Sequence, residues 1–145
     1  MTEKKLRSTR LAKRAPRRGA AVVEMAVVTP LLLTLVFGII EFSWAMSVSQ
    51  SITNAAREGC RTAVIQGTTT ADITGRVDAY LGSGGVGLEG YWVDITRATT
   101  TDPTETVTVS INYSDVSLVG GYFEWLESLH GKTLSATCSM RKEGT

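Results

Sequence analysis

The sequence predicts an α+β fold: a long N-terminal helix packed on a small antiparallel sheet of about three strands, with two short helices. Two patterns carry this prediction. A long apolar run passes into a stripe of small apolar residues at helical spacing, and three later segments alternate between apolar and polar residues. Such alternation is typical of an antiparallel sheet with one solvent-exposed face, and the apolar face of such a sheet needs a helix to cover it.

Residues 1–19 form a basic leader. They hold eight lysines and arginines and one acid, whereas acids outnumber bases in the rest of the chain, so the whole-chain net charge is only +1. A basic block directly before an apolar run fixes the orientation of a membrane protein and contacts anionic lipid. We therefore expect a cytoplasmic leader, a lipid bilayer as partner and no nucleic-acid partner.

A transmembrane helix is predicted for residues 20–46, from Ala20 to Met46. The run from Ala20 to Ile40 has 21 residues and a single charge, Glu24. About 20 apolar residues cross a hydrocarbon core of roughly 30 Å, and the aromatic residues Phe42 and Trp44 suit the interface beyond it. A cleaved signal peptide is the alternative, but its apolar core would be shorter.

Residues 47–67 are expected to continue this helix outside the membrane. Its apolar residues are separated by steps of three and four, and Gly67 is a typical helix stop. The predicted stripe consists of Val48, Ile52, Ala56, Cys60, Ala63 and Val64. One helix would thus run from about Ala20 to Gln66, bent at Pro30, which removes one backbone hydrogen bond.

Residues 68–145 are expected to form a small α+β domain outside the membrane. One helix is predicted at 72–81, ended by Gly82, and a second at 122–129, ended by Gly131. The first places Ile73, Val77, Tyr80 and Leu81 at helical spacing. The strands follow from three alternating sets: Tyr91, Val93 and Ile95; then Val107, Val109, Ile111 and Tyr113; then Leu134, Ala136, Cys138 and Met140.

No residue pattern indicates an enzyme, so we expect no catalytic, cofactor-binding or metal-binding residue. The single histidine, His130, is expected to interact with a helix C-terminus rather than to act as a base. Gly82, Gly84 and Gly87 spell G-x-G-x-x-G, but they follow a predicted helix and precede a strand, the reverse of a dinucleotide-binding loop. No group of His, Cys, Asp and Glu has the spacing of metal ligands.

The two cysteines, Cys60 and Cys138, lie on predicted inward faces and outside the membrane. That compartment favours a disulfide, which would join the last strand to the long helix. Two separate buried thiols are the alternative, because the sequence does not give the Cα separation of about 5.5 Å that a bridge needs. Both interpretations stay open.

Glu24 is the unusual residue of the apolar run. An ionised carboxylate costs about 2.5–3.5 kcal/mol at the centre of a span and less near an interface. One interpretation places Glu24 in the headgroups, with the span beginning at Met25. The other is that a protease cuts after Gly19. The new ammonium of Ala20 on a neighbouring subunit would then pair with Glu24 and fix the axial register of the helices.

These residues resemble the TadE-like family of tight-adherence (Flp) pilus systems. The similarity is carried by RRGAAVVEMAVVTPLLLTLVFGIIEF, by NAAREGCRTAV and, near the end, by LSATCSMRKE. It implies a non-catalytic pseudopilin or minor pilin in the bacterial cytoplasmic membrane, with its N-terminus inside and its last domain outside. The implied partners are other pilin or pseudopilin subunits, an inner-membrane assembly platform and a prepilin peptidase acting at Gly19, Ala20 and Glu24. Met25 departs from the tyrosine of the major Flp pilins.

A second function class stays open. The chain would then be an uncleaved signal-anchored protein whose outer domain binds a ligand or partner, with no part in a fibre. This class predicts that the leader is retained and that substitutions of Gly19 and Glu24 are tolerated. An anchored enzyme is a third class, for which the sequence offers no candidate site.

Overall fold

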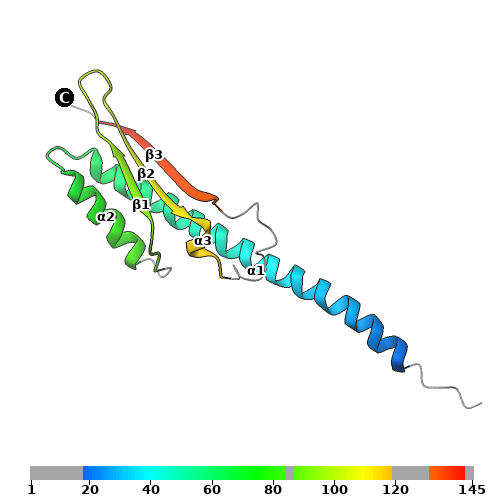
Figure 1. Ribbon diagram of the computed structural model, residues 1–145. Helices are drawn as coiled ribbons and strands as arrows, with labels where there is room; N and C mark the ends of the chain where they lie inside the picture. The colour runs from blue at the N-terminus through cyan, green and yellow to red at the C-terminus, as the bar shows by residue number, and fades with distance from the viewer. Residues whose placement is uncertain (1–17, 84–86, 119–130, 143–145) are drawn as a thin grey trace, which may run out of the picture. The chain divides into compact units, whose positions relative to one another are not determined.

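The computed structural model describes residues 18–83, 87–118 and 131–142. Its elements follow the order α1, α2, β1, β2, α3 and β3 (Figure 1), which confirms the predicted α+β class. The chain divides into two compact units, residues 1–36 and 37–145. Nearly all of the basic leader, the predicted helix at 122–129 and His130 lie outside the described residues.

The first unit contains the N-terminal part of α1 (Arg18–Ala63), which continues as a helix through Pro30. The Thr34 hydroxyl donates to the Pro30 carbonyl at 2.8 Å. Among the described residues, α1 is the one helix long and apolar enough to cross a membrane. Its exposed large apolar residues in this unit are Val22, Val23, Met25, Val27, Val28, Leu31, Leu32, Leu33, Leu35 and Val36.

In the second unit, α1 carries the predicted buried stripe except for Val64, which follows the end of the helix and is half-buried. The fully buried residues are Val48, Ile52, Ala55, Ala56, Cys60 and Ala63. Regular helix ends at Ala63, three residues before the predicted end at Gln66. The following turn reaches Gly67, whose φ of 81° lies in the left-handed region that glycine adopts without a steric penalty.

α2 (Thr70–Ser83) begins with a capping box. The Thr69 backbone N–H donates to the Asp72 carboxylate at 2.8 Å, and the Asp72 N–H donates back to the Thr69 hydroxyl at 3.3 Å. Its buried residues are the predicted Ile73, Val77 and Leu81. Tyr80, the fourth residue at this spacing, lies at the edge of the stripe and is 36% exposed. The predicted stop was wrong, because Gly82 has no positive φ and lies inside the helix.

The sheet has three antiparallel strands in the order β1-β2-β3. They are β1 (Trp92–Thr96), β2 (Thr104–Asn112) and β3 (Thr133–Arg141). The core-facing pairs are Val93 with Val109, Ile95 with Val107, Val107 with Cys138, Val109 with Ala136, and Ile111 with Leu134. The three alternating sets of the sequence therefore share one face, as predicted.

Two predicted strand residues behave differently. Tyr113, expected in the second strand, begins α3 (Tyr113–Val116), a single helical turn that follows Asn112 directly. Its N–H still donates to the Lys132 carbonyl at 2.8 Å, so the β2–β3 connection persists one residue beyond the ladder. Met140 was expected on the apolar face but is 36% exposed, because it lies near the end of β3, beyond the apolar core.

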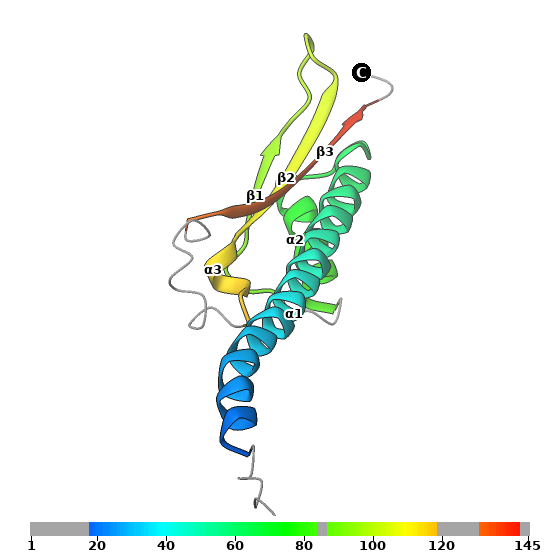
Figure 2. The ribbon, with the colours of Figure 1, turned by 90° about the vertical axis from the view of Figure 1, so that its right-hand side faces the viewer.

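α1 and α2 cover the apolar face of the sheet (Figure 1, Figure 2). They approach closely at Gly59: a Cβ added there would lie 2.9 Å from Val77 Cγ2 and 3.1 Å from Val107 Cγ1. The long helix, the second helix and the central strand thus meet at a position without a side chain. This arrangement confirms that the stripe on the long helix covers the sheet.

The opposite face of the sheet is polar. Two hydroxyl pairs join β2 to β3 across it: Thr106 with Ser139 and Thr108 with Thr137, each at 2.9 Å. Hydroxyl pairs on directly opposite residues stabilise an antiparallel pair of strands by about 0.2–1 kcal/mol each. The sheet therefore has one apolar and one hydroxyl-lined face.

Candidate anchoring and assembly sites

The predicted processing segment lies in the first turns of α1. Glu24 is exposed and has neither an ion pair nor a side-chain hydrogen bond within the part of the chain that the structure describes. Ala20 and Glu24 lie four residues apart on one helix face, a rise of about 6 Å. The structure therefore gives the Glu24 carboxylate no partner among these residues.

Gly19 has no packing reason to be glycine. A Cβ added at Gly19 would meet no atom within 4 Å, and its φ is not positive. Glycine within a helix costs about 1 kcal/mol relative to alanine. Neither packing nor backbone conformation among the described residues thus accounts for this residue, in contrast with Gly59.

A second carboxylate, Glu41, is only 7% exposed and lies on α1 within the second unit. It accepts hydrogen bonds from the Tyr113 hydroxyl at 2.8 Å, the Ser117 hydroxyl at 2.5 Å and the Leu118 backbone N–H at 3.2 Å. Burial raises the pKa of Tyr113 to about 12, and the hydrogen bond to Glu41 adds to this rise. Glu41 thus fastens the segment from α3 to residue 118 onto the long helix.

Trp44 strengthens the same attachment. Its indole N–H donates to the Val116 carbonyl at 2.7 Å, and its ring packs against the core. Phe42, the other aromatic residue expected at a membrane interface, is 68% exposed. The sequence interpretation missed Glu41 as a site. A charge that ends an apolar run, three residues before a tryptophan, is the signal that could have drawn attention to it.

The segment after the span combines small buried residues with exposed charges. Ala55, Ala56 and Gly59 face the core, whereas Arg57 and Arg61 are exposed. Glu58 pairs with Arg76 of α2, and this contact holds the pKa of Glu58 below its ordinary value. Small residues and one ion pair therefore dock α2 closely against α1.

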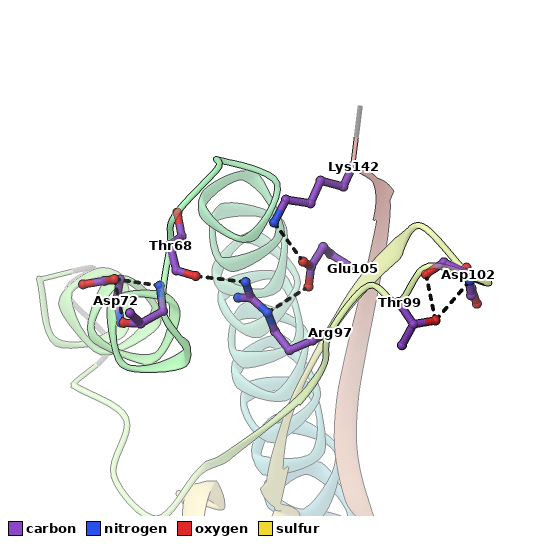
Figure 3. Close-up of polar contacts among 8 residues, drawn as sticks. Thr68, Asp72, Arg97, Thr99, Asp102, Glu105 and Lys142 are labelled. Atoms are coloured by element: carbon purple, nitrogen blue, oxygen red, sulfur yellow. Dashed lines mark hydrogen bonds and ion pairs between the residues drawn. The ribbon is translucent and has the colours of Figure 1, made fainter. Parts of the chain in front are cut away.

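A charged cluster closes the end of the core near the α1–α2 connection (Figure 3). Glu105, a core-facing residue of β2, is 1% exposed. Its carboxylate lies 3.4 Å from Arg97 Nε and 3.6 Å from Lys142 Nζ. Arg97 also donates from Nη2 to the Thr68 carbonyl at 2.9 Å. The cluster thus links the α1–α2 connection, through Thr68, to β2 and to the residues that directly follow β1 and β3.

The polar groups of this cluster are incompletely matched. Arg97 Nη1 and Glu105 Oε2 are buried without a hydrogen-bond partner within the described residues, although Oε2 is close to Arg97 Nε. A buried carboxylate needs its cations, because its desolvation costs several kcal/mol. The cluster is therefore a structural site whose members depend on one another.

The structure brings Cys60 and Cys138 together. The Cys60 thiol is buried in the second unit, and its Sγ donates to the Cys138 carbonyl oxygen at 2.8 Å. Both thiols are free. Burial raises the pKa of Cys60 to about 12, with a further contribution from the neighbouring Cys138 thiol. Among the described residues, no group of three or more His, Cys, Asp or Glu could hold a metal ion.

Comparison with known proteins gives one match. No curated protein and no solved structure matches the chain. Residues 19–61 match the family model described as TadE-like protein. This segment includes Glu24, Glu41 and Glu58 and the small residues that face the core. Together with the long apolar helix, the match fits a pilus-associated membrane protein. Over residues 19–61, the chain is therefore similar to TadE-like proteins.

Proposed function

We propose that the chain is a pseudopilin or minor-pilin-like component of a tight-adherence (Flp, type IV-like) pilus assembly system. It is anchored in the bacterial cytoplasmic membrane by α1, with the leader inside and the α+β domain outside. It is non-catalytic and packs with other pilin subunits through the span. Its further partners are a prepilin peptidase and the inner-membrane assembly platform.

One observation carries this proposal: the first unit exposes its large apolar side chains. Exposed fractions there run from 41% for Val36 to 73% for Leu31. Ten such side chains left in water would forgo on the order of 10 kcal/mol of burial free energy, which is as large as the whole stability of a typical domain. Lipid, and then the apolar helices of other subunits, supply the missing cover.

Glu24 fixes the axial alignment of this apolar helix against the helix of a neighbouring subunit. Its charge lies among exposed apolar side chains and finds no partner among the described residues. Cleavage after Gly19 would create an ammonium on Ala20, at nearly the same depth in the membrane as the Glu24 carboxylate. The ammonium of a neighbouring subunit would then neutralise Glu24 and offset its cost in lipid. Only one axial offset between neighbours brings these two groups together.

The processing step is tested at Gly19. In cells with the prepilin peptidase, intact-mass analysis should find Ala20 as the first residue, and Gly19→Phe should retain the leader. The matched control is Gly38→Ala, because an added Cβ at Gly38 also meets nothing within 4 Å. If the wild-type chain begins at Met1 or Thr2 with or without the peptidase, cleavage after Gly19 is refuted.

The register contact is tested at Glu24. Glu24→Gln keeps the size of the side chain and removes its charge, so it should leave membrane insertion intact and reduce incorporation into pilus assemblies at least tenfold. Met25→Leu is the control, because Met25 is the exposed neighbour of Glu24 on the same helix. Normal assembly by Glu24→Gln would refute the register contact and favour a signal-anchored protein without a role in a fibre.

The topology is tested by the five lysines. Lys4, Lys5 and Lys13 lie in the leader, whereas Lys132 and Lys142 lie in the α+β domain, and Lys132 is exposed. A membrane-impermeant amine reagent applied to spheroplasts that express Gly19→Phe, which should retain the leader, should label Lys132 and spare the leader. Labelling of the leader with protection of Lys132 would contradict the proposed orientation.

A further inference from the structure

The helix and the last strand bring two thiols to one place. Cys60 faces the core from α1, and Cys138 faces it from β3, where it pairs with Val107 of β2. Cys60 Sγ lies 2.8 Å from the Cys138 carbonyl oxygen. Since that oxygen is about 2.4 Å from its own Cα, Cys60 Sγ lies within about 5 Å of the Cys138 Cα.

This contact places the Cys60 sulfur beside the residue to which a disulfide would join it. A bridge needs Cα atoms about 4.4–6.8 Å apart and Cβ atoms about 3.8 Å apart. The thiol of Cys60 already contacts the backbone of the residue to which it would be joined. Rotation of the side chains, with a small shift of β3 against α1, is the movement that a bond requires.

We propose that Cys60 and Cys138 form an intramolecular disulfide in the exported domain. The proposal rests on the orientation in Proposed function, because only a domain outside the cytoplasm meets a disulfide-forming compartment. Its geometric part is independent of that orientation and can be tested on the purified chain.

The order of the two steps follows from burial. Cys138 is half-buried and Cys60 is fully buried, so the Cys138 thiolate attacks first. It attacks the disulfide of an oxidant, such as glutathione disulfide or a disulfide-bearing protein oxidase, and one oxidant thiol leaves. The Cys60 thiolate then attacks the Cys138 sulfur and expels the second thiol. Two protons and two electrons pass from the cysteines to the oxidant.

The bond would fasten the end of the chain to the helix that carries the anchor. Among the described strands, β3 pairs with β2 alone. A covalent link at Cys138 would keep this edge strand in place when the domain is loaded or partly opened. The closed loop would contain α2, β1 and β2, so it would also restrict the unfolded chain.

The test uses the full chain in detergent micelles. The reduced protein is incubated with glutathione disulfide near pH 8.5, and the remaining thiols are alkylated before digestion with trypsin. The expected product joins Glu58–Arg61 to Thr133–Arg141 and lacks two hydrogen atoms. In a parallel undigested sample, reduction of the bridged chain should lower its melting temperature by on the order of 10 °C.

Single variants separate a bridge from simple thiol reactivity. Cys60→Ala should stop at a stable glutathione adduct on Cys138, and Cys138→Ala should react slowly because Cys60 is buried. A wild-type chain that accumulates the same adduct as Cys60→Ala, or that forms only intermolecular dimers, would overturn the proposed bridge.

The exported chain gives the second arm. Cells are treated with an alkylating agent before lysis, and the same two peptides are sought in the envelope fraction. Linked peptides support the proposal. Two alkylated cysteines in a chain whose Lys132 is labelled from outside would overturn it while leaving the proposed function intact. A domain protected from the amine reagent would instead contradict the proposed function.

Discussion

The charged cluster around Glu105 predicts an unequal response to the loss of its two partners. Glu105 has 1% side-chain exposure, whereas Arg97 has 33% and Lys142 has 15%. Arg97→Met therefore leaves a buried carboxylate whose remaining cation, within the part of the chain that the structure describes, is the Lys142 ammonium. Glu105→Met leaves two long cationic side chains, which can turn outward.

The magnitudes follow from this difference in exposure. Removing one partner of a buried ion pair costs about 3–5 kcal/mol when the other stays buried, so we expect Arg97→Met to fall in that range. Glu105→Met should cost less, about 1–2 kcal/mol, because its former partners regain water. The free energy of unfolding of the double variant should be close to that of Glu105→Met alone, because no buried carboxylate is left without its cation.

The assay is urea unfolding of the full chain in micelles, followed by the fluorescence of its three tryptophans, Trp44, Trp92 and Trp125. The free energies of unfolding of wild type, both single variants and the double variant form a cycle with an expected coupling of at least 2 kcal/mol. If Glu105→Met costs more than Arg97→Met, or if the double variant equals the sum of the singles, the argument from exposure is refuted.

Three further predictions use other contacts. Gly59→Ala should destabilise the domain by about 1–3 kcal/mol in urea unfolding, because the added methyl overlaps two valines. The control Gly75→Ala should be neutral or stabilising, because an added Cβ there meets nothing within 4 Å. Equal effects of the two substitutions would contradict the close approach at Gly59. Tyr113→Phe should cost about 1.5–3 kcal/mol in the same assay because Glu41 loses a donor in a half-buried site, and a change within error would refute this contribution. The capping hydrogen bonds of Asp72 hold its pKa below the usual 3.8, so their stabilisation is present above about pH 4 and is lost as the pH falls through the lower, folded-state pKa. Stability measured against pH should therefore drop less steeply in Asp72→Asn below pH 4, and identical profiles would contradict this assignment.

The helical stripe and the strand faces were predictable from the sequence because burial repeats with the period of each element. Val48, Ile52 and Cys60 follow helical steps, and Val107 and Val109 follow strand alternation. Periodicity does not fix boundaries with the same certainty. A glycine such as Gly82 fits inside a helix as well as after it, and α3 is too short to show a period.

The charged sites were not predictable in the same way. Glu41 bonds to residues more than 70 positions later, and no local pattern encodes that pairing. Glu105 obeys the alternation of its strand, yet a charged residue is expected at an inward position only where cations such as Arg97 and Lys142 lie beside it. Tertiary contacts between polar groups depend on register and connection, which a single sequence does not specify.

The contrast between the two faces of the sheet has a consequence for folding. In β3, hydroxyl residues occupy alternate positions from Thr133 to Ser139, and Leu134, Ala136 and Cys138 lie between them. If β3 slipped by one residue against β2, four hydroxyls would be forced among valines and the apolar side chains would be turned into water. Each hydroxyl buried without a hydrogen bond would cost about 1–3 kcal/mol, so the shifted pairing of β3 with β2 would dissociate before the rest of the domain folded onto it.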